Sequence, residues 1–232
     1  MIYNWLVEIR TMFEKFQLRN QMYRLKRELK LRKVYRVPHI SLVYDFTPMI
    51  NPYRIAEIIQ ETAKKYKNLE FSYSGLELKR GVKGYVFGFK IVPSDELRYF
   101  RYELYNNLKP YIYESSSARV FNSASIEDFW FHASIAFHLK KETAERINKF
   151  MNNRNVETNF ISNSFNIIFR DEDNIQNKSK LELFNLHARV VRITLLRRGG
   201  IVYEYDTLLN KILNRREALS RKTFEQDNLH LL

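Results

Sequence analysis

The chain has 232 residues and a net charge of +13, and it combines 45% apolar residues with no cysteine. This much apolar side chain can bury a core, which excludes a disordered protein, and the lack of cysteine excludes disulfides and thiolate chemistry. No apolar run reaches the roughly 18 residues of a membrane-spanning helix, and Glu8, Arg10 and Glu14 interrupt the stretch that a signal peptide would need. We expect a globular cytoplasmic monomer without membrane contact, built as one domain over 1–232.

The first half of the chain alternates apolar strands with amphipathic helices. Leu18, Met22 and Leu25 recur at spacings of four and three residues, which is typical of a helix with one apolar stripe. Ser94 is a favourable N-cap, because its hydroxyl can accept a hydrogen bond from a free backbone N–H. The predicted elements are a strand over 2–9, a helix over 12–30, a strand over 39–46, a helix over 53–67, strands over 69–79 and 84–92, and a helix from Ser94 to Pro110.

The second half of the chain repeats this alternation after a Ser-rich loop. Gly199 and Gly200 supply the positive φ angles that a two-residue hairpin turn needs. The predicted elements are a loop over 115–125, a strand over 128–138, a helix over 140–152, strands over 156–169 and 188–198 with an exposed loop at 171–180 between them, a return strand over 201–205, and a basic helix over 207–222.

An internal repeat relates the two halves. His39-Ile-Ser-Leu-Val-Tyr, followed by a helix and paired strands, is echoed by His132-Ala-Ser-Ile-Ala-Phe with the same elements after it. Strands outnumber helices and tight hairpins join them, which favours an antiparallel α+β fold over a doubly wound one. We predict a bilobal molecule with two pseudo-symmetric antiparallel sheets, flanking helices and a central cleft. Its two interleaved lobes each carry one His-x-Ser motif.

The repeated motif places an imidazole and a hydroxyl on one face of each strand. Side chains alternate between faces, so His39 points the same way as Ser41, and His132 the same way as Ser134. One imidazole can take a proton from an attacking water or hydroxyl while the other gives one to the leaving oxygen. Each hydroxyl can donate to a phosphate oxygen on which negative charge develops. The motifs therefore predict phosphodiester cleavage without a metal or another cofactor.

The two motifs carry a family resemblance. The segments Pro38-His39-Ile40-Ser41-Leu42 and Phe131-His132-Ala133-Ser134-Ile135, with the opening strand and helix and the late hairpin, resemble the two-histidine (2H) phosphoesterase superfamily. Within it, the chain is most similar to the 2'-5' RNA ligase and RNA 2',3'-cyclic phosphodiesterase family. The resemblance covers nearly the whole chain. It implies a cleft between the lobes that holds a 2',3'-cyclic phosphate on RNA or a nucleotide.

The resemblance also implies roles for the motif residues. His39 and His132 would be the catalytic acid–base pair, with Ser41 and Ser134 binding the phosphate. We assign His132 to activating water and His39 to protonating the leaving group. The implied reaction is hydrolysis to a 2'-phosphate. Joining the cyclic end to a 5'-hydroxyl as a 2'-5' linkage uses the same groups, and trimming of RNA 3' ends is a further option within the superfamily.

The chain departs from the family where a second cation is expected. Bacterial members commonly carry a basic residue five positions after the second motif histidine, where this chain has Phe137. Arg36, Lys33 or Arg119 are alternative partners for the phosphate charge. His138 shares a face with His132 by alternation. The candidate substrate contacts are therefore Arg36, Phe137 and His138.

Two basic clusters suggest a polyanionic partner. Residues 10–36 contain ten Lys and Arg against two Glu, and a second cluster lies near the C-terminus. Clustered cations favour nucleic acid, because phosphate neutralisation releases condensed counterions. A solvated helix face is the alternative reading. The members of the second cluster are Lys211, Arg215, Arg216, Arg221 and Lys222.

Two other classes of function compete with the enzyme. The first is an RNA- or nucleotide-binding module that keeps the fold without catalysis, and it has no need for two imidazoles that face one phosphate. The second is a protein-interaction scaffold that uses the N-terminal helix, and it predicts no salt-dependent affinity for RNA. The intact set of four motif residues favours the enzyme.

Overall fold

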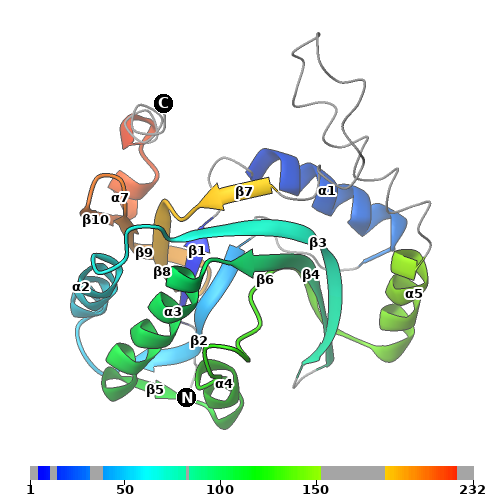
Figure 1. Cartoon of the computed structure of the whole chain (residues 1–232), viewed down its shortest axis with the longest axis horizontal. Coiled ribbons are helices and arrows are strands. Elements are labelled where there is room, and N and C mark those ends of the chain that lie inside the picture. The colour runs from blue at the N-terminus through cyan, green and yellow to red at the C-terminus, as the bar shows by residue number, and fades with distance from the viewer. Residues whose placement is uncertain (1–4, 11–14, 32–38, 82–83, 153–185, 224–232) are drawn as a thin grey trace.

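The computed structural model of the chain describes residues 5–10, 15–31, 39–81, 84–152 and 186–223 (Figure 1). In chain order its elements are β1 (Trp5–Arg10), α1 (Lys15–Glu28), β2 (His39–Pro48), α2 (Pro52–Ala63), β3 (Glu70–Gly81), β4 (Gly84–Pro93), α3 (Asp95–Leu108), the 3₁₀ turn η1 (Lys109–Tyr111), β5 (Ile112–Glu114), α4 (Ser116–Asn122), β6 (His132–Leu139), α5 (Lys141–Asn152), β7 (Leu186–Arg189), β8 (Arg192–Arg197), β9 (Gly200–Asp206), β10 (Lys211–Asn214) and α7 (Arg215–Ala218). None of the helices in these ranges has the length and apolar character needed to cross a membrane.

The strands form one curved antiparallel sheet, which confirms the predicted α+β class. Its order is β10-β9-β8-β1-β2-β6-β4-β3-β7, and β5 pairs with β2 outside this path. The two predicted sheets are thus halves of a continuous sheet. They join where β2 meets β6, with Ile40 opposite Ala133. Both motif strands therefore lie side by side at the centre of the sheet.

The chain interleaves the two halves of the sheet. After β2 it passes through α2 and then supplies β3 and β4, and β4 pairs with β6. After β6 come α5 and then β7, which pairs with β3, before β8 and β9, and β8 pairs with β1 beside β2. Each motif strand is thus followed later in the chain by a hairpin that supports the other motif strand.

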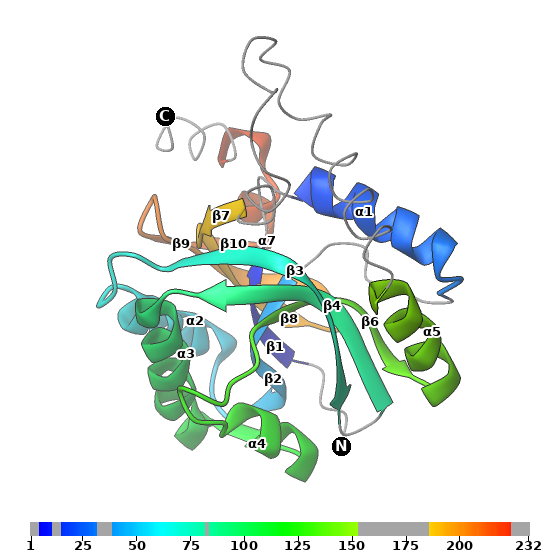
Figure 2. The same ribbon diagram turned by 45° about the vertical axis from the view of Figure 1, so that its right-hand side comes forward.

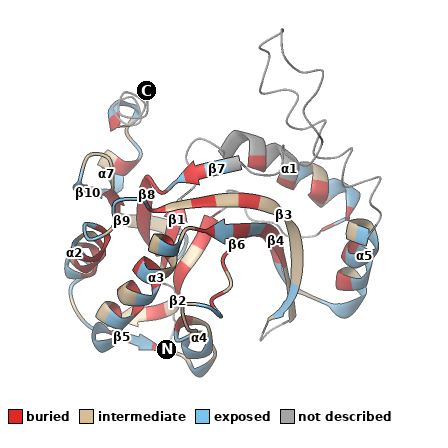
Figure 3. Cartoon of the chain, in the orientation of Figure 1, coloured by how far each residue is buried: buried red, intermediate tan, exposed pale blue. Residues whose placement is uncertain are grey.

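Helices α2 and α3 cover one face of the sheet (Figures 1 and 2). Ile55 and Ile59 of α2 and Leu97 of α3 are buried against the sheet. Buried residues also occur along β2 (Figure 3). Pro52 opens α2 and the Asn51 side chain accepts from the Tyr53 N–H, so the helix begins with a capped end. Because Ile40 and Leu42 point into the hydrophobic core, the motif residues His39 and Ser41 lie on the opposite face.

The predicted Ser-rich loop over 115–125 is wrong in part, because it contains the helix α4. Ser115 is its N-cap and accepts a hydrogen bond from the Ala118 N–H. Only Ala118 and Asn122 are buried in this short helix. It therefore carries no apolar stripe that the sequence pattern can reveal.

The predicted basic helix over 207–222 is also wrong. The Asp206 carboxylate accepts hydrogen bonds from the Leu208 and Leu209 N–H groups and closes a turn after β9. The chain then returns as β10, and α7 begins only at Arg215. A capping box between Asn214 and Glu217 marks that start.

Smaller differences concern boundaries. The β8–β9 hairpin turns at Arg198 and Gly199, both with positive φ, one residue before the predicted pair. Strand β6 begins at His132 rather than at 128. The predicted strand over 156–169 and loop over 171–180 lie outside the described residues.

Candidate active site

The four motif side chains gather at the junction of β2 and β6. The β2–β6 pair sets Ile40 opposite Ala133, and an antiparallel arrangement therefore directs His39 toward Ser134 and Ser41 toward His132. His39, His132 and Ser134 are buried, and Ser41 is half-buried. Two imidazoles and two hydroxyls therefore share one face of two neighbouring strands.

His132 is held in one tautomer by the backbone. Its Nδ1 lies 3.0 Å from the carbonyl oxygen of Trp130. A carbonyl only accepts hydrogen bonds, so Nδ1 carries the proton and Nε2 keeps its lone pair. Burial lowers the pKa of His132 to about 4, with smaller contributions from the charges of His39 and Lys79. At neutral pH His132 is thus an uncharged base.

The indole of Trp130 covers one side of the His132 ring. The two rings are stacked, with centroids 3.8 Å apart and planes inclined by 16°. The indole N–H donates to Glu77, and Lys79 Nζ lies 4.9 Å from the ring centroid. Lys79 also forms an ion pair with Glu77, at 3.6 Å. Trp130 is therefore fixed by groups on β3, and it fixes His132 in turn.

His39 faces a carboxylate instead of a carbonyl. Its Nε2 lies 3.7 Å from Oε2 of Glu8, and Glu8 is opposite Ser41 in the β1–β2 pair. Burial raises the pKa of Glu8, while the positive charges of His39 and Arg10 act in the opposite direction. Glu8 was not among the predicted site residues, and its only signal is a charge within an apolar strand.

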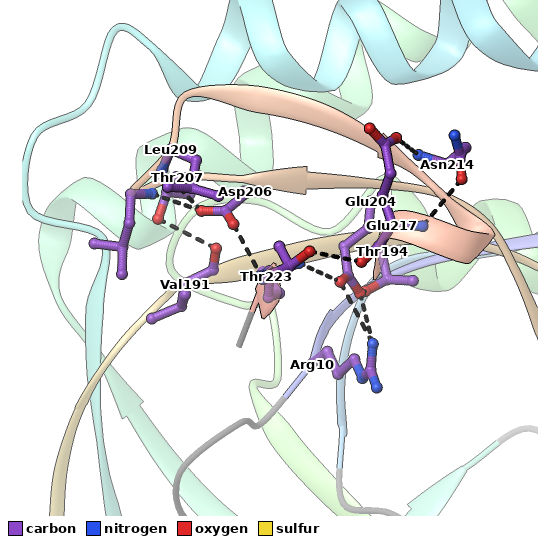
Figure 4. Close-up of polar contacts among 12 residues, drawn as sticks. Arg10, Val191, Thr194, Glu204, Asp206, Thr207, Leu209, Asn214, Glu217 and Thr223 are labelled. Atoms are coloured by element: carbon purple, nitrogen blue, oxygen red, sulfur yellow. Dashed lines mark hydrogen bonds and ion pairs between the residues drawn. The ribbon is translucent and has the colours of Figure 1, made fainter. Parts of the chain in front are cut away.

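A buried cluster of charges lies on the strands next to Glu8, and Figure 4 shows its polar contacts. Glu204 accepts hydrogen bonds from Arg192 at 2.9 Å, from Thr194 at 2.6 Å and from Arg10 at 3.2 Å. Arg192 also forms an ion pair with Asp206 at 3.1 Å. Glu8, Thr194 and Glu204 are successive partners across β1, β8 and β9. The cluster ties β1, and with it Glu8, to the neighbouring strands.

A pocket of about 570 Å³ opens beside the motif residues. Residues of α4 and of the β3–β4 hairpin form its walls. Most of the lining is apolar and aromatic. The lining residues are Ser41, Tyr44, Arg80, Gly81, Gly84, Val86, Ser117, Val120, Phe121, Trp130, His132, Ser134, Phe137 and His138. His39 is not in this lining; it is buried, and its Nε2 faces Glu8.

A β-bulge changes the orientation expected at the end of β6. The β4–β6 register shifts between the pairs at Ala136 and Leu139, and His138 has a φ of 53°. Strict alternation places Phe137 and His138 on opposite faces, but both are exposed and both line the pocket. The aromatic Phe137 therefore stands in the pocket wall.

Of the remaining candidate cations, the structure describes Arg119, which does not line the pocket. Arg36 and Lys33 lie outside the described residues. Arg119 on α4 is exposed and forms an ion pair with Glu114 at 3.6 Å. Arg80, which was not predicted, is the one Lys or Arg among the described residues that line the pocket. Nothing in the sequence next to Arg80 indicates that this residue lines a pocket.

Helix α4 is anchored to the first motif strand. Asn122 accepts from the Tyr44 N–H at 2.7 Å and donates to the Tyr44 carbonyl at 2.9 Å. The buried guanidinium of Arg101 donates to the carbonyl of Leu42 on β2, and to three carbonyls at the end of α4 and just after it. These bonds set the distance between the α4 wall and the motif residues.

Comparison with protein-family models matches residues 15–201 to the 2'-5' RNA ligase superfamily. The matched span covers most of the chain and contains both His-x-Ser motifs. No curated protein sequence gives a match. Within the described ranges, no three His, Asp or Glu side chains gather in a group that could hold a metal ion.

Proposed function

Because the chain belongs to the 2'-5' RNA ligase superfamily, we propose that it opens 2',3'-cyclic phosphates at RNA ends or on nucleotides, leaving a 2'-phosphate. The observation that carries this proposal is the pair of His-x-Ser motifs on adjacent antiparallel strands beside one pocket. Two imidazoles supply both proton transfers of a phosphodiester hydrolysis. The proposed reaction uses no metal ion.

In the proposed mechanism His132 is the general base. Its Nε2 takes a proton from water, and the water oxygen attacks phosphorus in line with the 3'-oxygen. The new P–O bond forms while the bond to the 3'-oxygen breaks. The fixed tautomer supports this role, because the lone pair of Nε2 is available. The negative charge of a bound cyclic phosphate raises the pKa of His132 toward neutrality and strengthens the base.

His39 is the general acid in this scheme. Its Nε2 faces the Glu8 carboxyl group, and its imidazole gives a proton to the departing 3'-oxygen. The hydroxyls of Ser41 and Ser134 donate to the non-bridging oxygens, where negative charge builds up in the transition state. With a 5'-hydroxyl in place of water, the same proton transfers form a 2'-5' linkage.

The aromatic lining supports a nucleoside as the group that carries the phosphate. Tyr44, Phe121 and Phe137 present rings to the pocket, and Trp130 lies against His132. Unpaired bases are bound in many proteins by stacking on such rings. A nucleotide whose base contacts these rings places its cyclic phosphate near the motif hydroxyls.

The test is conversion of a short RNA that ends in a 2',3'-cyclic phosphate, incubated with the purified protein in EDTA. We expect a product phosphate that resists a 3'-specific phosphatase. His39→Ala and His132→Ala should each reduce the rate about 10²- to 10⁴-fold, the usual contribution of a general acid or base. Their free energies of unfolding, measured in parallel, separate loss of chemistry from loss of fold.

The same assay separates the enzyme from the binding module. If wild type binds the RNA at low salt but leaves the cyclic phosphate intact, the protein is a binding module, and the proposed function is wrong. Retention of RNA binding by an inactive His39→Ala variant supports the enzyme. Absence of any salt-dependent affinity for RNA favours the scaffold.

A further inference from the structure

The pocket extends beyond the motif residues to a polar rim made by Arg80 and His138. Arg80 lies near the end of β3 and His138 near the end of β6, and both are exposed. The intervening strand β4 connects them through the pairs Arg80–Tyr85 and Tyr85–Leu139. The rim is thus a second polar region at the pocket, separated from His132 by the bulge in β6.

Arg80 is available for a ligand. Within the described ranges its guanidinium makes no hydrogen bond or ion pair, although the residue lines the pocket. Lys79 beside it is engaged with Glu77 and Trp130. A guanidinium presents parallel N–H donors that match two oxygens of a phosphate. An unengaged guanidinium at the edge of a phosphodiesterase pocket is suited to a second phosphate.

The backbone at His138 departs from regular strand geometry, and the residue lines the pocket at this rim. A histidine with positive φ within a strand is strained, and such strain persists where the surroundings determine it. Gly84 makes the close approach of β4 possible, since a Cβ at that position would lie 2.8 Å from the Leu139 carbonyl oxygen. The bulge and Gly84 together present the His138 imidazole, a further N–H donor, to the same pocket.

We propose that Arg80 and His138 bind the phosphodiester on the 5' side of the terminal nucleotide, so that the protein prefers oligonucleotide ends to mononucleotides. This inference rests on the proposed function. In every RNA strand that ends in a cyclic phosphate, the next phosphodiester lies one nucleotide upstream and carries one negative charge. The Arg80 guanidinium donates to its two non-bridging oxygens and His138 adds an N–H donor. A mononucleotide 2',3'-cyclic phosphate has no group for this subsite.

Three substrates test the inference in the wild-type protein. They are adenosine 2',3'-cyclic phosphate, the dinucleotide uridylyl-adenosine 2',3'-cyclic phosphate, and the same dinucleotide with a neutral methylphosphonate between its nucleosides. We expect kcat/KM to be about tenfold or more higher for the charged dinucleotide than for the mononucleotide, since charge-assisted hydrogen bonds have this strength. The methylphosphonate dinucleotide should lose most of that advantage.

Two variants locate the effect. Arg80→Gln should reduce kcat/KM for the charged dinucleotide about tenfold and change the ratio of dinucleotide to mononucleotide toward one. His138→Asn keeps a residue that tolerates positive φ but has no imidazole, and it should give a smaller change in the same direction. Arg146→Gln on α5 removes an exposed charge outside the pocket, so it controls for net charge and should leave the ratio unchanged.

The outcomes distinguish this inference from the proposed function. Equal kcat/KM for all three substrates overturns the phosphate subsite and leaves the cyclic phosphodiesterase intact. A methylphosphonate dinucleotide as good as the charged one also overturns it, because the advantage then comes from the second nucleoside. No turnover of any of the three overturns the proposed function and this inference with it.

Discussion

Glu8 and His39 form a buried pair across β1 and β2, with Oε2 of the carboxylate 3.7 Å from Nε2 of the imidazole. The equivalent partner of His132 is the carbonyl oxygen of Trp130, at 3.0 Å from Nδ1. A carboxyl group can carry a negative charge beside an imidazole, whereas a carbonyl fixes a tautomer and adds no full charge. The pseudo-symmetry of the two motifs is therefore broken by their partners, and this difference distinguishes the proposed acid from the proposed base.

Replacing Glu8 tests its role as a positioning residue. Glu8→Gln keeps the shape of the side chain and removes its charge, so it should lower kcat for the cyclic phosphate about ten- to hundredfold. Burial raises the pKa of Glu8, so loss of the charge should cost little stability. Glu8→Asp should recover part of kcat. A large loss of unfolding free energy with unchanged kcat would show that Glu8 is only structural.

A sulfur substitution tests the assignment of acid and base. With sulfur in place of the bridging 3'-oxygen, the leaving group is a thiolate that departs without a proton. The defect of His39→Ala should then largely disappear, while His132→Ala should stay defective by about 10²-fold or more because water still needs a base. The measurement is the ratio of rates for the oxygen and sulfur substrates in each variant. Rescue of His132→Ala instead would reverse the two roles.

The buried His132 should make stability depend on pH. Its folded-state pKa of about 4 lies below the ordinary value of 6.5, so the unfolded chain binds the proton more tightly. This group leaves the free energy of unfolding unchanged above pH 6.5 and lowers it as the pH falls toward 4, by about 3 kcal/mol in total. Urea unfolding of wild type and His132→Asn between pH 4 and 7 measures the effect. The difference between the two proteins should change with pH, and a constant difference contradicts the buried neutral histidine.

The buried guanidinium of Arg101 should be important for both stability and the pocket wall. Burial lowers its pKa to about 9, and its N–H groups satisfy four backbone carbonyls. Arg101→Met leaves those carbonyls without donors and should cost about 3 kcal/mol or more, as measured by chemical denaturation. It should also raise KM, since α4 loses its link to β2. Arg98→Met on the same helix is the control and should change stability by no more than about 0.5 kcal/mol.

The sequence predicts the elements whose burial has a clear period. Strand β2 and helix α2 alternate or repeat their apolar residues against one core face, and both lie close to the predicted ranges. The predicted basic helix over 207–222 is the counterexample. Four residues of β10 pair with β9 there, and the Asp206 turn that directs them depends on side-chain to backbone bonds. Composition does not reveal such bonds.

The site shows the same division between local and tertiary information. Alternation within one strand is local, so the shared face of His39 and Ser41 is predictable. The register of β2 against β6 and the presence of Glu8 beside His39 depend on which strands become neighbours. The bulge at His138 is a local deviation that alternation excludes by assumption. The position of Arg80 at the pocket likewise depends on which strands become neighbours, as the position of Glu8 beside His39 does.

Gly88 on β4 holds the second motif strand at close range. It is opposite Ser134, and a Cβ built on it would lie 2.7 Å from the Ala133 carbonyl oxygen and 3.4 Å from the Ser134 Cα. Gly88→Ala must therefore displace β6. We expect a loss of about 1–3 kcal/mol in unfolding free energy, as for other overpacked sites. Gly200→Ala, whose Cβ would meet its nearest atom at 3.5 Å, is the matched control with little effect.

The same displacement should reach the chemistry through Ser134. Gly88→Ala should lower kcat/KM about tenfold, because the hydroxyl moves from the phosphate oxygen that it is proposed to bind. A double-mutant cycle makes this specific: once Ser134→Ala has removed the hydroxyl, adding Gly88→Ala should reduce kcat/KM much less than it does in wild type. Additive losses would mean that Gly88→Ala lowers the rate through stability or through other pocket residues. Its effect would then not be transmitted by Ser134.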